Sequence, residues 1–353
     1  MSGSETIFSK DGGLGRVRLN RPKVLNALSA AQYHALTETL TTWEDDDSVA
    51  LVLVEGEGER AFCAGGDIRM VWEAQARGDH DFNRQIFRTE YRLNRRIHHY
   101  PKPYIAILDG IVMGGGAGIS INGKWRIATE RTQFAMPETG IGFFPDVGAT
   151  SFLGRCPGAL GLYLGLTGAR LGPADCVAAG LATHFVPQAE LDAMTAKFLV
   201  AAASSDSGGA AEDVLRRFHR DPGPGPMALR AAEVDRCFGR GTLGDILAAL
   251  RSEKSDWAWD TVEDLSSRSP TSLAVTFRQL TEGRGLAFDD AIRREFRLAC
   301  RFLAGRDLFE GIRAQVIHKD RRPNWSPASL SEVDEIAVDG YFASLGGDEL
   351  PLP

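Results

Sequence analysis

The sequence predicts an α/β protein with a mostly helical C-terminal region. Short apolar runs at residues 15–20, 50–55 and 104–108 are typical of strands that are buried on both faces. Stretches with helical spacing of apolar residues lie between them, and this alternation favours an α/β sheet. Weaker strand candidates follow at residues 125–128 and 133–136.

The first helix is expected at residues 29–46, between the first two strands. Ser29 is suited to the N-cap position, and Gln32 three residues later completes a capping box. Apolar residues then recur at helical spacing, namely Leu36, Leu40 and Trp43. A second helix, rich in arginine, is expected at residues 82–99 and ends before Pro101.

The composition changes near residue 204. Residues 204–209 and 221–226 are rich in Ser, Gly, Asp and Pro, as linkers are. The pattern beyond them is helical, at residues 243–254, 272–279 and 288–303. We therefore predict a core domain of residues 1–200 and a mostly helical region of residues 201–353.

Charge and hydropathy exclude several classes of function. Forty Lys and Arg residues against 47 Asp and Glu give a net charge of −7, which argues against non-specific nucleic-acid binding. No apolar run is long enough to span a membrane. The first residues lack a basic segment followed by an apolar one, which leads us to expect a cytoplasmic protein.

The five cysteines form no Cys-x-x-Cys pair and have no histidine at ligand spacing. We therefore expect the cysteines to be buried, reduced thiols. We expect neither a disulfide framework nor a cysteine-based metal site.

Two glycine-rich segments can supply free backbone N–H groups. Residues 113–118 follow the strand at 104–108, and their glycines can turn the chain tightly and open a helix. Residues 61–68 follow the strand at 50–55, with Gly66 as a second donor and Asp67 as a helix cap. Such donors can hold a developing oxyanion. Each segment taken alone favours the alternative, a tight turn that only joins a strand to a helix.

A third segment, residues 136–148, places Glu138 and Asp146 in an otherwise apolar loop. Burial raises the pKa of a carboxyl group toward neutrality, where it can act as a general acid or base. The alternatives are a solvated loop residue for Glu138, and a turn or N-cap for Asp146.

The order of these segments, with residues 21–28 before them, resembles the crotonase (enoyl-CoA hydratase/isomerase) superfamily. More narrowly, the chain resembles the 3-hydroxyisobutyryl-CoA hydrolase branch, the thioesterases of valine breakdown. The narrower resemblance rests on residues 87–94, 269–273, 278–280, 310–314 and 319–320.

The resemblance implies a spiral of repeated ββα units with an acyl-CoA site, which the C-terminal helices help to cover. It implies that the N–H groups of Gly66 and Gly115 hold a thioester carbonyl, that Glu138 and Asp146 are catalytic, and that Glu90 contacts the substrate. Coenzyme A is expected to lie against five residues, Lys23, Val24, Ala64, Asp67 and Ile68.

Hydratases of this superfamily carry a second catalytic glutamate. This chain has Gly118 at that position, and glycine has no side chain that could donate or accept a proton. We therefore expect thioester hydrolysis of a short 3-hydroxyacyl-CoA. The alternatives are a hydratase or isomerase of the same superfamily and a non-catalytic acyl-CoA-binding protein. No cofactor or metal is expected, because the N–H donors supply the electrophile. We expect the protein to bind a small acyl-CoA and to bind neither nucleic acid nor a membrane. A homo-oligomer is compatible with the family.

Overall fold

The computed structural model describes residues 4–352, which form two compact units. The first contains residues 4–66, 92–134 and 171–228, and the second contains residues 67–91, 135–170 and 229–352. The chain therefore passes repeatedly from one unit to the other. The sequence analysis predicted two consecutive regions, residues 1–200 and 201–353. That division stays a prediction.

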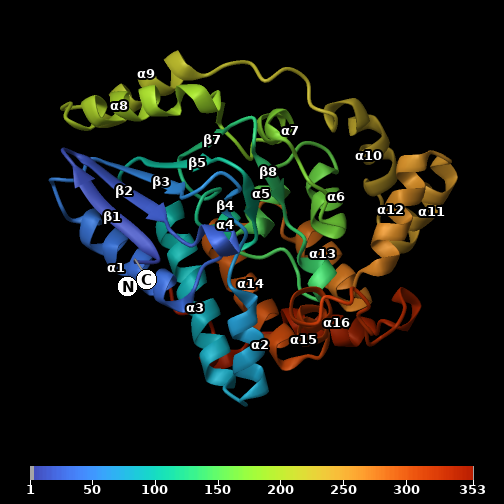
Figure 1. Cartoon of the computed structure of the whole chain (residues 1–353). Helices are drawn as coiled ribbons and strands as arrows, with labels where there is room; N and C mark the ends of the chain where they lie inside the picture. Colours follow the sequence, from blue (N-terminus) through green and yellow to red (C-terminus); the bar gives the residue numbers. More distant parts are fainter. Residues whose placement is uncertain (1–3, 353) are drawn as a thin grey trace. The chain divides into compact units, whose positions relative to one another are not determined.

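The first unit is built on a six-stranded sheet in the order β1-β2-β3-β5-β7-β9 (Figure 1). Only β1 and β2 pair antiparallel within it, and the other neighbours are parallel. Its strands are β1 (Thr6–Asp11), β2 (Leu14–Leu19), β3 (Leu51–Gly56), β5 (Tyr104–Leu108), β7 (Trp125–Ala128) and β9 (His184–Phe185). The apolar runs thus form the predicted strands, and the α/β fold class is confirmed.

A second, three-stranded sheet has the order β4-β6-β8. It consists of β4 (Ala61–Cys63), β6 (Ile111–Met113) and β8 (Gln133–Ala135). Each of these short strands lies beside a segment that the sequence singled out, because β4 precedes Gly66, β6 precedes Gly115 and β8 precedes Glu138.

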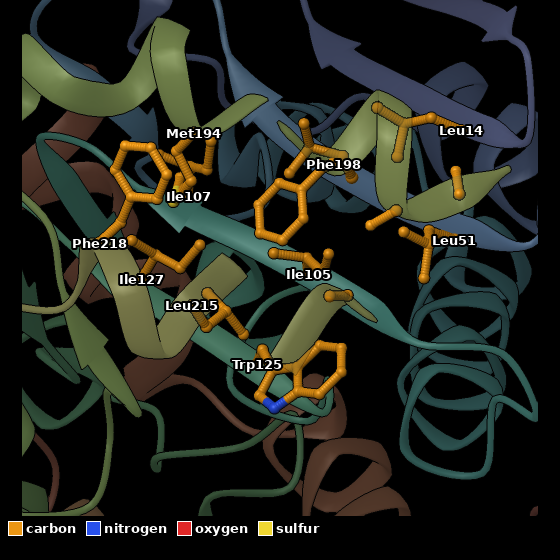
Figure 2. Packing of buried hydrophobic residues seen from close by; sticks show 14 of the residues in the cluster. Leu14, Leu51, Ile105, Ile107, Trp125, Ile127, Met194, Phe198, Leu215 and Phe218 are labelled. Atoms are coloured by element: carbon orange, nitrogen blue, oxygen red, sulfur yellow. The ribbon is translucent and has the colours of Figure 1, made fainter. Parts of the chain in front are cut away.

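The hydrophobic core of the first unit lies between the large sheet and two helices, α8 (Leu191–Ala202) and α9 (Ser207–Phe218). Figure 2 shows Phe198 of α8 packed beside Ile105 of β5, and Leu215 of α9 near Trp125 of β7. Parallel strands buried on both faces need apolar residues at successive positions, and β5 has them at all five.

Helix α1 (Ala30–Glu44) begins with the predicted capping box. Gln32 N donates to Ser29 Oγ (3.2 Å), and Ser29 N donates to Gln32 Oε1 (3.1 Å). The unit also contains α4 (Gly115–Gly118) and α7 (Pro173–Ala178).

The second unit is mostly helical. Its helices are α2 (Ile68–Ala76), the first part of α3 (His80–His98), α5 (Ala149–Gly154), α6 (Leu160–Thr167), α10 (Ala231–Phe238), α11 (Leu243–Glu253), α12 (Asp256–Ser267), α13 (Pro270–Glu282), α14 (Phe288–Ala304), α15 (Asp307–Ile312) and α16 (Glu335–Phe342). The helices predicted at residues 82–99, 243–254, 272–279 and 288–303 correspond to α3, α11, α13 and α14.

The segment at residues 204–209 is not a linker, because α9 begins within it at Ser207. Asp206 caps this helix by accepting a hydrogen bond from Gly209 N (2.9 Å). The residue types that predict a linker are also those that begin helices, which is why the sequence misled here. Within residues 4–352, no helix is long and apolar enough to cross a membrane.

Candidate active site

Glu138 begins the 3-10 turn η2 (Glu138–Ile141), directly after β8. The turn is fixed by Thr139, whose Oγ1 donates to Leu166 O on α6 (3.0 Å). The Glu138 side chain is only 6% exposed, and its Oε2 has no hydrogen-bond partner among the described residues. A buried carboxylate oxygen of this kind is an acceptor that a ligand can satisfy.

Asp146 lies in the loop between η2 and α5, and it is 5% exposed. Its Oδ2 accepts a hydrogen bond from the hydroxyl of Tyr91 on α3 (2.7 Å). Tyr91 is itself completely buried, with its ring edge-on to Phe87 and Phe296. This aromatic packing fixes the hydroxyl, and the hydroxyl in turn orients the carboxylate.

Glu138, Asp146 and Glu90 form a cluster of acids, in which Glu138 lies close enough to the other two for their charges to shift its pKa. Burial raises the pKa of Glu138 well above its ordinary value, and the charges of Asp146 and Glu90 raise it further. Burial also raises the pKa of Asp146 to about 7, against the lowering effect of the Tyr91 hydrogen bond. A carboxyl group with a pKa near neutrality, as Asp146 has, can take up and release protons during a reaction.

The two glycine segments lie side by side in the first unit. Gly114, with φ of 47°, precedes α4, and Gly115 is the first residue of that helix, where an N–H has no acceptor within the helix. A Cβ at Gly116 would lie 2.3 Å from Cys63 O, so the backbone of α4 packs directly against that of β4 and leaves no room for a side chain there. A Cβ at Gly65 would lie 3.6 Å from Gly115 N. The predicted donors of Gly66 and Gly115 thus belong to adjacent segments.

The predicted coenzyme A residues are divided between the units. In the first unit, Lys23 and Val24 lie on η1 (Pro22–Val24), and Val24 is 48% exposed. Ala64 is joined to this segment because its N–H donates to Leu25 O (3.0 Å). Asp67 and Ile68 begin the second unit, at the start of α2. Asp67 occupies the N-cap position, as predicted, but its side chain makes no capping hydrogen bond.

The predicted site residues as a whole are likewise divided between the two units. The first unit holds Lys23, Val24, Ala64, Gly66 and Gly115, and the second holds Asp67, Ile68, Glu90, Glu138 and Asp146.

The sequence analysis missed three buried polar residues around the Asp146 loop, namely Tyr91, Gln279 and Glu295. Tyr91 and Gln279 lie within motifs that carried the family resemblance. Glu295 could have been noticed in the sequence, because it is an acidic residue on the otherwise apolar face of the helix at residues 288–304. An acid at such a position is costly to bury unless it is hydrogen-bonded.

Among residues 4–352, no group of three or more His, Cys, Asp or Glu side chains is arranged to hold a metal ion. The five cysteines are free and buried, as expected.

Known proteins of similar sequence and structure carry two kinds of name. A curated relative from Xenopus tropicalis, named 3-hydroxyisobutyryl-CoA hydrolase, mitochondrial, is 42% identical over 99% of this chain and 91% of its own length. A crystal structure described as a carnitinyl-CoA dehydratase from Mycobacterium thermoresistibile has a TM-score of 0.91, with 40% identity over 99% of both chains. Another, described as an enoyl-CoA hydratase from Rhodobacter sphaeroides 2.4.1, has a TM-score of 0.92, with 37% identity over 99% of this chain and 100% of its own.

The expectation of a cytoplasmic protein is wrong, because the Xenopus relative is named as mitochondrial. The expectation rested on the lack of a secretory pattern in the first residues, and the lack of that pattern does not by itself identify a compartment.

The family model for enoyl-CoA hydratase/isomerase matches residues 14–342, nearly the whole chain. Together with the two solved structures, this match confirms the predicted resemblance and the crotonase-type α/β fold. The chain belongs to the enoyl-CoA hydratase/isomerase family.

Proposed function

We propose that the protein hydrolyses 3-hydroxyisobutyryl-CoA, or a close short 3-hydroxyacyl-CoA, to the free hydroxy acid and coenzyme A, as a step of valine degradation. The observation that carries the proposal is the buried pair Glu138 and Asp146, both with raised pKa values. The name of the Xenopus relative supports the same reaction.

The reaction replaces the thioester C–S bond by a C–O bond from water. The N–H groups of Gly66 and Gly115 hold the carbonyl oxygen as it becomes an oxyanion, and each such donor contributes about 2.7–4 kcal/mol to lowering the barrier. Glu138 either attacks the carbonyl carbon, giving a mixed anhydride that water then cleaves, or takes the proton of an attacking water. In both routes the departing thiolate receives a proton and leaves as coenzyme A.

Asp146 activates the water or binds the hydroxyl of the acyl group, and Glu90 contacts the same hydroxyl. A buried acid whose oxygen lacks a partner, as Glu138 Oε2 does among the described residues, favours an acyl chain with a hydrogen-bond donor. An alkyl chain would leave these acids without partners, so the site selects against it. Lys23, Val24, Ala64, Asp67 and Ile68 hold the coenzyme A portion.

A second candidate is a hydratase or dehydratase reaction, which the names of the two solved structures favour. That reaction moves two protons, one at oxygen and one at carbon. In hydratases of this family the second acid stands at the position of Gly118, which is the last residue of α4 here and carries no side chain. Hydrolysis needs no acid at that position.

One purified sample tests both candidates. Free thiol is followed with 3-hydroxyisobutyryl-CoA and with isobutyryl-CoA, which lacks only the hydroxyl, while the enoyl absorbance is followed with crotonyl-CoA. We expect thiol release from the hydroxylated substrate at a kcat/KM about 100-fold or more above that of isobutyryl-CoA. Loss of enoyl absorbance without thiol release would overturn the proposal in favour of the second candidate.

The same assay tests Glu138. Glu138→Gln should lower kcat by about 10²- to 10⁴-fold because the amide can neither attack nor accept the proton. Glu263→Gln, an exposed position on α12, is the matched control and should keep the wild-type rate. Full activity of Glu138→Gln would refute the role given to Glu138.

A further inference from the structure

The loop that carries Asp146 has a backbone conformation that one of its residues, Val147, disfavours. Val147, directly after the acid, has φ of 56°, and Gly148 has φ of 93°. A β-branched residue in the left-handed region is strained, and it persists only where surrounding contacts impose it. The contacts that impose it here come from two C-terminal helices.

The first contact is made by Glu295, in the middle of α14. One oxygen, Oε2, accepts a hydrogen bond from Gly148 N (2.6 Å), and Oε1 accepts another from Thr150 N (2.8 Å). The side chain is fully buried among the apolar residues of its helix. A buried carboxyl group is costly, and these two bonds to the loop are what offsets the cost.

The second contact is made by Gln279 on α13, which is also fully buried. Its Nε2 donates to Pro145 O (2.7 Å) and to Thr150 Oγ1 (2.9 Å). The other amide atom, Oε1, has no partner among the described residues, so the amide is held by the loop. Pro145 precedes Asp146 and Gly148 follows it, so the two helices hold the backbone on both sides of the acid.

We infer that Glu295 and Gln279 are positioning residues of the reaction, which act by fixing the backbone on either side of Asp146. Tyr91 in addition donates a hydrogen bond to the Asp146 carboxylate itself. The inference rests on the proposed function, because it assigns these residues to the catalytic role of Asp146. A purely structural role is the alternative, in which their loss lowers stability but not the rate of the folded enzyme.

The test uses Gln279→Leu and Glu295→Gln. A displacement of a catalytic group by about 1 Å can cost about 100-fold in rate, so we expect kcat to fall by about 10- to 100-fold while KM changes by less than about twofold. Thr276→Val is the matched control. Thr276 is fully buried on α13, one turn from Gln279, and its Oγ1 has no partner among the described residues. This control should keep the wild-type kcat.

A double variant separates positioning from general damage. If Gln279 acts through Asp146, Gln279→Leu should lower the residual kcat of Asp146→Asn by less than about twofold. The same fold-loss in both backgrounds would overturn the inference, as would a wild-type kcat for Gln279→Leu in the natural background. If Glu295→Gln does not fold, the Gln279→Leu series still decides.

A crystal structure of Gln279→Leu gives a readout that does not depend on activity. We expect Val147 to leave the left-handed region or the bond from Tyr91 to Asp146 to break, and an unchanged loop would overturn the inference. A wild-type enzyme without thioesterase activity would refute the proposed function instead, and the crystal structure would still test what holds the loop.

Discussion

Glu138 and Asp146 are held in surroundings that oppose their charged forms. Each is at most 6% exposed, and burial is the main cause of the raised pKa of both groups. Stability therefore falls as these groups ionise, because the unfolded chain releases their protons more readily than the folded chain does. Functional groups that are costly to keep ionised are typical of active sites.

The pH dependence of this cost can be measured at Asp146. Its pKa is about 7 in the folded chain, against 3.8 ordinarily, so its contribution to stability is full below about pH 4 and is lost as the pH rises through 7. Asn at this position keeps an acceptor for Tyr91 and cannot ionise. Asp146→Asn should therefore raise the free energy of unfolding more at pH 8 than at pH 5, by on the order of 2 kcal/mol.

Urea denaturation at the two pH values measures this difference. Asp260→Asn, an exposed position on α12, is the control and should show no such dependence. An equal gain for Asp146→Asn at pH 8 and pH 5 would contradict the assignment of a raised pKa to this residue.

At the scale of elements, the short helix α4 depends on its contact with β4. The contact requires glycine at position 116, because a Cβ there would lie 2.3 Å from Cys63 O and 2.9 Å from Cys63 C. The neighbouring Gly115 N–H is one of the two donors proposed to hold the oxyanion. Any displacement of α4 from β4 would therefore change both stability and the position of that donor.

Gly116→Ala should lower the free energy of unfolding by about 1–3 kcal/mol, because the backbones of α4 and β4 must separate. It should also lower kcat for thiol release, since Gly115 moves with the helix. Gly340→Ala in α16, where a Cβ would meet nothing within 4 Å, is the control and should stabilise by up to about 1 kcal/mol. Unchanged stability and rate in Gly116→Ala would refute this account of the helix.

For the whole molecule, the large apolar cluster and the acid cluster belong to different compact units. The apolar cluster joins β2, β3, β5 and β7 to α8 and α9, all of them in the first unit (Figure 2). The acids lie in the second unit, where α13 and α14 hold the Asp146 loop. A substitution in the apolar cluster should therefore affect folding without altering the acids directly.

Phe198→Ala, at a fully buried position of α8, should lower the free energy of unfolding by about 3–5 kcal/mol through lost burial and a cavity. The kcat per folded molecule should stay at the wild-type value. Val200→Ala, 70% exposed on the same helix, should change stability by less than about 0.5 kcal/mol. Urea denaturation and active-site titration check these expectations, and a reduced kcat in folded Phe198→Ala would contradict them.

Local patterns predicted the strands β2, β3, β5, β7 and β8 and the helices α1, α3, α11, α13 and α14. The sequence motifs predicted the family, and the remaining strands and helices were not assigned. The strand at residues 104–108 and the capping box at Ser29 follow from local patterns, because burial on both faces and capping depend on neighbours within the same segment. The glycine segments and the two acids were also predicted from local features, together with the family motifs. Their catalytic roles stay predictions until the variants are measured.

The groups that surround the acids could not be predicted from the sequence, because tertiary packing brings them there. The Tyr91 hydroxyl reaches Asp146 across 55 positions of sequence, and Glu295 reaches Gly148 across 147. No local pattern encodes such contacts, since they depend on how α3, α13 and α14 pack. The raised pKa values and the left-handed Val147 have the same origin, because burial and backbone strain are imposed by parts of the chain that are distant in sequence.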